Sequence, residues 1–299
     1  MTTADAVEIA CDESGFSGSN LLDPASPVIT HASTDLTAAE AGELLADLAQ
    51  RFAHPAAAEH KAYVLLRPGS PDAVDWFLDA LRGRAHVHAV DKRAFVASRA
   101  LDLLVGEPSY GDGTLLGADH RGEAAVLRER TAFLTAFVAM VRTRRVHRVD
   151  HAAVTRFLAE VPDDVPVLRG LTRARVVSVL ERLVAGDPTI PPPLEPLIPA
   201  VADTVLWWSA GRRSVVLVHD EQSALTPQRM ARLATHLAQA AAPAPPPLLG
   251  GRQVDSRDDA RIQVADLLAG VARRDASFTA AVPDRIGTSG CRPDPRLPH

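Results

Sequence analysis

Acidic side chains end three short, mostly apolar runs of this sequence, at Asp12, Asp91 and, after His219, Asp220. A fourth acid, Asp266, lies in an apolar stretch near the C-terminal end. Carboxylates gathered from distant segments can hold two hard divalent cations, which activate a water and stabilise the leaving oxygen of a phosphodiester. The pattern therefore indicates metal-dependent phosphodiester hydrolysis as one chemistry open to the chain.

The first of these acids ends a predicted strand. Val7, Ile9 and Cys11 alternate with polar or small residues, as in a half-buried strand, and Ser14-Gly15 interrupt the run. A strand end holds a carboxylate rigidly, and a glycine after it allows a ligand close to the backbone. An alternative also stays open, in which Asp12 and Glu13 are ordinary polar residues at a strand-to-turn junction.

The other acids depend on elements far along the chain. If the three strands that end in Asp are parallel neighbours, their carboxyl ends meet at one edge of a sheet, where α/β proteins place their sites. Asp266 shares a predicted helix face with Asp259, Gln263 and Gly270. That face either looks at solvent or, with a small residue in it, approaches the edge of the sheet.

Hydrophobic periodicity and capping signals place these elements within an α/β chain. Strands are predicted at 6–12, 28–32, 63–66, 85–90 and 214–218, and helices at 37–53, 71–81, 93–104, 226–241 and about 256–273. Residues 1–122 and 210–275 are expected to form the α/β core, and the mostly helical residues 123–209 an insert. The proline- and glycine-containing residues 276–299 are expected to be a disordered tail.

Composition limits the function classes. The chain is 46% hydrophobic and 23% charged, as in ordinary globular proteins, and no apolar stretch approaches the roughly 20 residues of a membrane helix. Residues 1–5 lack the basic region of a signal peptide, and the two cysteines lie at opposite ends of the chain. We therefore expect a cytoplasmic protein without a membrane partner. Oligomeric state is open.

The net charge and one basic run bear on whether the protein binds nucleic acid. The formal net charge of -5 argues against a surface coated with basic residues. The run from Arg142 to Arg148 either contacts a phosphate backbone or forms the solvated end of a helix. Nucleophile-elbow and P-loop motifs are absent from the sequence, which disfavours α/β-hydrolases and P-loop NTPases.

Five short motifs together resemble the family called domain of unknown function 3800, which is similar to the ribonuclease H-like superfamily. They are Asp12-Glu13-Ser14-Gly15, Glu59 with Lys61, Val90-Asp91-Lys92, Val218-His219-Asp220-Glu221, and Gln263-Val264-Ala265-Asp266-Leu267-Leu268-Ala269-Gly270. The last motif is the most specific, and the first is next. Residues 123–209 and the tail carry no part of the resemblance.

The resemblance implies a ribonuclease H-like mixed sheet flanked by helices, with carboxylate-bound Mg²⁺ or Mn²⁺. Asp12 is then the central ligand, Asp266 the ligand on the final helix, and Glu59 the acid supplied after the first long helix. The remaining strand-end ligand is Asp220 or Asp91, and both stay open. Catalytic candidates are thus Asp12, Glu59, Asp220 and Asp266, and metal-ligand candidates are Asp12, Asp91, Asp220 and Asp266.

Two functional hypotheses follow. The first is a metal-dependent, nuclease-like hydrolase that acts on nucleic acid. The second is a binding or regulatory protein that keeps the fold and docks a protein partner through the helical insert. The set of acids favours the first, and the negative net charge slightly favours the second. Bound metal in contact with Asp12 and Asp266 would distinguish them.

Overall fold

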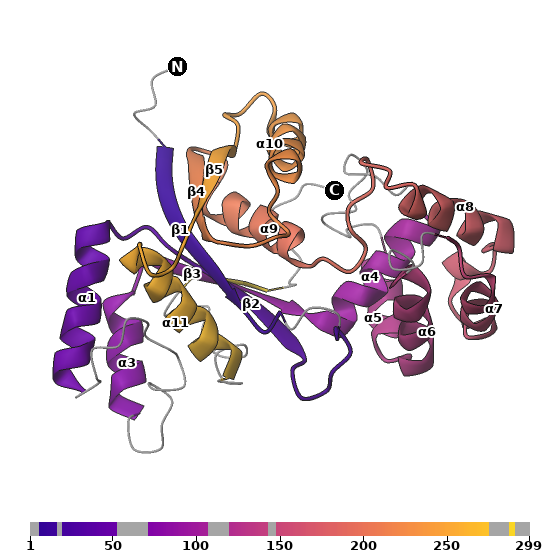
Figure 1. The fold of residues 1–299 in the computed structure, drawn as a ribbon, viewed down its shortest axis with the longest axis horizontal. Helices are drawn as coiled ribbons and strands as arrows, with labels where there is room; N and C mark the ends of the chain where they lie inside the picture. The colour runs from indigo at the N-terminus through magenta and orange to yellow at the C-terminus, as the bar shows by residue number, and fades with distance from the viewer. Residues whose placement is uncertain are drawn as a thin grey trace. The chain divides into compact units, whose positions relative to one another are not determined.

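The computed structural model describes residues 6–16, 20–52, 71–106, 120–142, 148–274 and 287–290 (Figure 1). The chain divides into two compact units. Unit 1 comprises Met1–Phe16, Val28–Val90 and Ala200–His299, and unit 2 comprises Ser17–Pro27 and Asp91–Pro199. Glu59 and the strand predicted at 63–66 lie outside the described residues. The predicted bounds of core, insert and tail stay predictions.

A mixed β-sheet forms the centre of unit 1, so the predicted α/β class is confirmed. Its order is β5-β4-β1-β2-β3-β6. Strand β1 pairs in parallel with β4 and antiparallel with β2, while β4 pairs in parallel with β5. The bounds are β1 Ala6–Ser14, β2 Val28–Thr34, β3 Ala85–Asp91, β4 Ser214–Asp220, β5 Leu248–Val254 and β6 Gly287–Gly290.

The alternation of side chains sorts the helices of unit 1 onto two faces of the sheet. Helix α11, Ala260–Arg274, packs on the face that carries Ala10, Ala32 and Val218. Helices α1, Ala38–Arg51, and α3, Pro71–Ala80, extend the same apolar core. Helix α9, Leu197–Ser209, contacts the opposite face, where the Trp208 Nε1–H donates to Ser33 Oγ at 2.8 Å. Helix α10 is Pro227–Ala241.

Local signals explain why several predicted elements form. Helix α1 has the capping box that its sequence predicts: Thr37 Oγ1 accepts from the Glu40 N–H at 3.2 Å, and Glu40 Oε2 accepts from the Thr37 N–H at 2.7 Å. Strand β5 was not predicted. It lies at one edge of the sheet, its side chains are mostly exposed, and Gly250 and Gly251 replace apolar residues within it.

Unit 2 is helical. Rings of Phe133, Phe137 and Phe157 pack together in its core, with centroids 5.3 and 6.2 Å from that of Phe157. The Lys92 backbone N–H donates to Pro27 O at 2.9 Å, which joins the two segments of the unit. Its elements are α4 Lys92–Leu104, α5 Arg121–Arg128, α6 Thr131–Val141, α7 His151–Ala159, η3 Pro166–Leu168 and α8 Arg173–Val184.

Across the described part of the chain, no helix combines the length and the apolar character needed to cross a membrane.

Candidate carboxylate site

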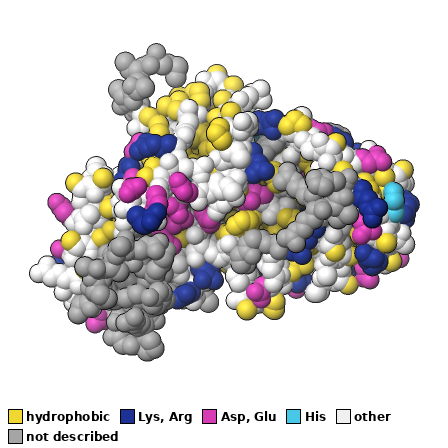
Figure 2. Space-filling model, in the orientation of Figure 1, with side chains coloured by type: hydrophobic (Ala, Val, Ile, Leu, Met, Phe, Trp, Pro, Cys, Tyr) yellow, Lys and Arg dark blue, Asp and Glu magenta, His cyan; other side chains and the backbone are white. Residues whose placement is uncertain are grey.

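Two of the predicted acids lie where the neighbouring parallel strands β1 and β4 stop pairing, although β1 continues beside β2 to Ser14. The β1–β4 pairing ends at Cys11 and His219, so Asp12 and Asp220 lie just beyond the last pair of residues. Asp12 is only 7% exposed. The prediction that acidic strand ends meet at one edge of the sheet is therefore confirmed for this pair. Figure 2 shows acidic side chains, with basic ones beside them, on the side of unit 1 that faces the viewer.

Asp266 joins this edge from helix α11, which packs against β1 and β2. The sequence leaves open whether the helix face with Asp266 looks at solvent or at the sheet. In the structure Asp266 is half-buried and its charge acts on Asp12, so this face looks at the sheet. Burial and then the charges of Glu13, Asp266 and Asp220 raise the pKa of Asp12 to about 9. The Glu13 N–H, which donates to Asp12 Oδ1 at 2.7 Å, opposes that rise.

Asp12 and Glu13 project to opposite faces of the sheet, since they are consecutive in a strand. Asp12 faces α11. Glu13 lies on the α9 face, where its Oε1 accepts from Gln222 Nε2 at 2.6 Å and its Oε2 is 3.8 Å from His219 Nε2. Among the described residues no group hydrogen-bonds Glu13 Oε2, although that atom is buried. The acidic pair thus places one carboxyl group on each side of this strand end.

Backbone and side-chain donors orient the neighbouring acid and the turn after β1. Asp220 Oδ1 accepts from the Ser256 N–H at 3.0 Å. The Arg273 Nε–H donates to Ser14 Oγ at 3.0 Å, so a guanidinium lies beside the turn that follows Asp12. Arg273 is seven residues after Asp266, which is about two helical turns, and therefore shares its face of α11.

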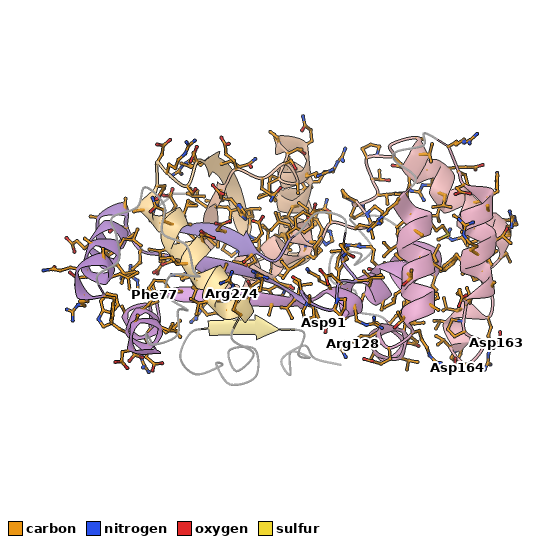
Figure 3. All side chains as sticks on the ribbon, turned by 60° about the horizontal axis from the view of Figure 1, so that its bottom comes forward. Phe77, Asp91, Arg128, Asp163, Asp164 and Arg274 are labelled. Carbon is orange, nitrogen blue, oxygen red and sulfur yellow. The ribbon has the colours of Figure 1, made fainter. Side chains whose placement is uncertain are left out.

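The remaining two candidates are in other surroundings. Asp91 caps helix α4, where its Oδ1 accepts from the Ala94 N–H at 2.8 Å, and its Oδ2 pairs with Arg128 Nη2 at 2.6 Å (Figure 3). Both carboxylate oxygens therefore have protein partners in unit 2. In the sheet, β2 separates β3 from β1, so the strand that leads to Asp91 is not a neighbour of β1. Glu59 is not among the described residues.

The donor set at Asp12, Asp220 and Asp266 consists of carboxylate oxygens, which suit the hard cations Mg²⁺ and Mn²⁺. Within the described ranges, no three His, Cys, Asp or Glu side chains converge closely enough to define a metal centre. The charges of Asp220 and Asp266 both act on the carboxyl of Asp12.

Sequence reasoning missed three contributors to this region. Arg273 had a usable signal, because its seven-residue spacing from Asp266 predicts a shared helix face. His31 and His219 had no such signal, because their contact joins β2 to β4 across β1. The order of strands in a sheet does not follow from the pattern within each strand.

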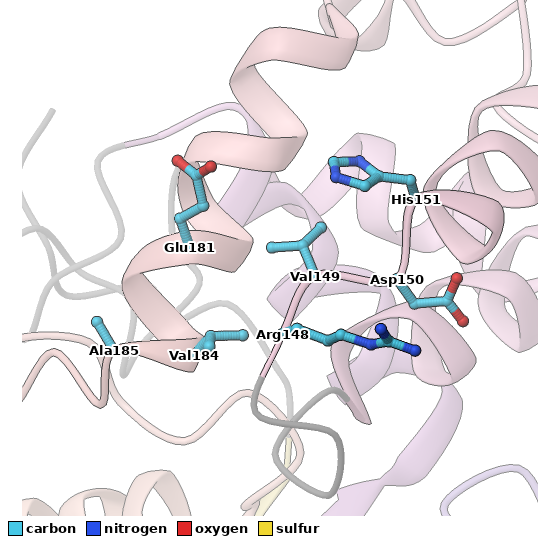
Figure 4. A pocket seen from close by; sticks show the side chains of 7 residues that line it. All are labelled: Arg148, Val149, Asp150, His151, Glu181, Val184 and Ala185. Atoms are coloured by element: carbon cyan, nitrogen blue, oxygen red, sulfur yellow. The ribbon is translucent and has the colours of Figure 1, made fainter.

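A separate open pocket of about 770 Å³ lies in unit 2, between the start of α7 and the end of α8 (Figure 4). Asp150 accepts from the backbone of Ala152 and Ala153 and so already caps α7. None of the predicted catalytic or metal-binding residues lines the pocket, whose lining is Arg148, Val149, Asp150, His151, Glu181, Val184 and Ala185.

Comparison with family models, with curated proteins and with solved structures finds no significant match to this chain.

Proposed function

We propose that unit 1 is a ribonuclease H-like core that hydrolyses phosphodiesters with Mg²⁺ or Mn²⁺ held by Asp12, Asp220 and Asp266. The sheet supports the fold: β1 lies between an antiparallel β2 and the parallel pair β4 and β5. The relationship to the domain of unknown function 3800 family belongs to the same proposal, because its two most specific motifs contain Asp12 and Asp266.

The observation that carries the proposal is the buried carboxyl of Asp12 at the edge of the sheet, with Glu13, Asp220 and Asp266 near enough for their charges to act on it. This carboxyl is buried, and three other acids act on it strongly enough, together with burial, to raise its pKa to about 9. Like charges held together in a low-dielectric site favour either a bound proton or a bound cation. Asp220 is favoured over Asp91 as the strand-end ligand, because both oxygens of Asp91 are engaged by Ala94 and Arg128.

When bound, a divalent cation would supply an activated water and charge stabilisation for the leaving oxygen of a phosphodiester. The chain's own contribution is to hold the acids on rigid elements, two strand ends and one helix. Arg273 adds a basic group on the Asp266 face of α11, and a guanidinium fork suits phosphate oxygens. We assign Arg273 to substrate phosphate, beside the acids that hold the cation.

The proposal is tested by incubating end-labelled single- and double-stranded RNA and DNA with the full chain and Mn²⁺. The wild type is expected to cut at least one of them, and Asp266→Asn to cut it at least 100-fold more slowly. Asp47→Asn is the matched control, because it makes the same change on the exposed face of α1. Equal rates for Asp266→Asn and the wild type, or cleavage of no substrate, would contradict the proposal.

A further inference from the structure

Two buried imidazoles meet on the α9 face of the sheet, behind Asp12. His31 Nε2 on β2 lies 3.2 Å from His219 Nε2 on β4, and both residues are fully buried. Because β1 lies between these strands, the pair spans it. In the register of the sheet His31 is opposite Glu13 and His219 is opposite Cys11. Asp12 lies between those two positions and projects from the other face.

The contacts of these rings define where each proton lies. His219 Nδ1 is 3.0 Å from the backbone carbonyl of Asp220, and a carbonyl only accepts, so this nitrogen carries the proton. Full burial favours the neutral form of both imidazoles, in which each ring carries one proton. His219 Nε2 is then an acceptor, and the proton between the two rings belongs to His31 Nε2.

The same reasoning extends to helix α9. Since His31 donates through Nε2, its Nδ1 must accept, and Thr204 Oγ1 lies 2.8 Å away as the donor. The three hydrogen bonds all run in one direction, from the Thr204 hydroxyl through His31 and His219 to the Asp220 carbonyl. This chain of donors joins α9, β2 and β4 where the β1–β4 pairing stops.

We propose that Thr204, His31 and His219 are positioning residues that hold the end of β4, and with it the carboxyl group of Asp220, beside Asp12. The inference rests on the proposed metal site, because it assigns these residues a role in that site. Asp220 follows the last β1–β4 pair, so its main chain at this point is held by the pairing with Val254 of β5 and by contacts outside the sheet. The hydrogen bond from His219 supplies one directly to its carbonyl oxygen.

A matched pair of substitutions separates this role from packing. Thr204→Val keeps the volume of the buried side chain and removes the donor, whereas Thr204→Ser keeps the donor and removes a methyl group. Titration of the full chain with Mn²⁺ alone is expected to show roughly tenfold weaker binding for Thr204→Val and nearly wild-type binding for Thr204→Ser. A packing role predicts the opposite order, and that order would overturn the proposal.

A second measurement tests the chain of hydrogen bonds without metal. In ¹⁵N NMR spectra of the metal-free wild type, we expect the proton of His31 on Nε2 and that of His219 on Nδ1, and altered signals in Thr204→Val. The reverse tautomers would overturn the chain. Wild-type Mn²⁺ binding that Thr204→Val leaves unchanged would overturn the positioning role while the proposed function stands. Absence of binding by the wild type would remove both, even with the expected tautomers.

Discussion

At the scale of single residues, the proposed metal site depends most on Asp12. Its carboxyl is buried between β1, β4 and α11, and the charges of Glu13, Asp266 and Asp220 act on it. Without a cation, the raised pKa keeps Asp12 protonated at neutral pH, whereas a bound divalent cation requires the ionised form. Protonation of Asp12 therefore competes with binding of the cation, and it also affects the stability of the fold.

The pH dependence of stability tests this view of Asp12. Its pKa is about 9 in the folded protein and near the ordinary value of 3.8 when unfolded, so between these values the folded state binds more protons. The contribution of Asp12 to the free energy of unfolding is thus largest below about pH 4 and falls as pH rises toward 9. Asp12→Asn removes this dependence, and we expect it to stabilise the metal-free protein at pH 7 by roughly 1–4 kcal/mol.

Urea denaturation with a chelator, at several pH values between 4 and 9, measures the difference between wild type and variant. Asp47→Asn is the control, because it makes the same chemical change at a carboxyl that is exposed on α1. A difference between Asp12→Asn and wild type that is constant over this range would show that Asp12 is not held protonated.

At the scale of elements, the turn after β1 depends on a glycine. Gly15 has a φ of +93°, and a Cβ there would lie 2.6 Å from Arg273 Cδ and 2.6 Å from the Val28 carbonyl oxygen. A backbone oxygen cannot move aside cheaply, and the positive φ adds strain for any other residue. Gly15 thus allows β2 and Arg273 to approach the end of β1 closely.

Gly15→Ala is therefore expected to lower the free energy of unfolding by at least about 1 kcal/mol. Gly42→Ala is the matched control: Gly42 lies within α1, where an added Cβ meets nothing within 4 Å, and the change should stabilise by roughly 0.5–1 kcal/mol. Urea denaturation measures both. Equal effects of the two substitutions would contradict the close approach at Gly15.

The sequence predicts those helices and strands that have a local pattern of their own. The capping box of α1, the alternation in β1 and β3 and the short apolar runs of β2 and β4 are local patterns, and the predicted elements form there. Strand β5 has no such pattern, because an edge strand with exposed side chains needs no apolar alternation.

The candidate site is only partly predictable from the sequence. The pattern predicts Asp12, Asp91 and Asp220 equally as strand ends. Only the strand order, which depends on packing between distant segments, makes Asp220 the neighbour of Asp12. The contact between His31 and His219 is missed for the same reason, since it crosses β1.

At the scale of the whole molecule, the chain has two compact units, each with apolar residues of its own. Phe77 lies in the core of unit 1, and Phe157 packs with two other phenylalanines in unit 2. Both side chains are fully buried. The carboxylates of the proposed metal site all belong to unit 1.

Thermal unfolding should therefore show two transitions, one for each unit. We expect Phe77→Ala and Phe157→Ala, which cost about 3–5 kcal/mol each, to lower different transitions. Mn²⁺ should raise only the transition that Phe77→Ala lowers, because a ligand stabilises the unit that binds it. Differential scanning calorimetry with and without Mn²⁺ measures this. A rise in the transition lowered by Phe157→Ala would place the cation in unit 2.

Binding of a divalent cation by the acids around Asp12 is the central claim, and isothermal titration of the full chain with Mn²⁺ tests it most directly. We predict saturable binding by the wild type and by Asp47→Asn, and its loss in Asp12→Asn. Binding that survives Asp12→Asn unchanged, or no binding by the wild type at millimolar Mn²⁺, would contradict it.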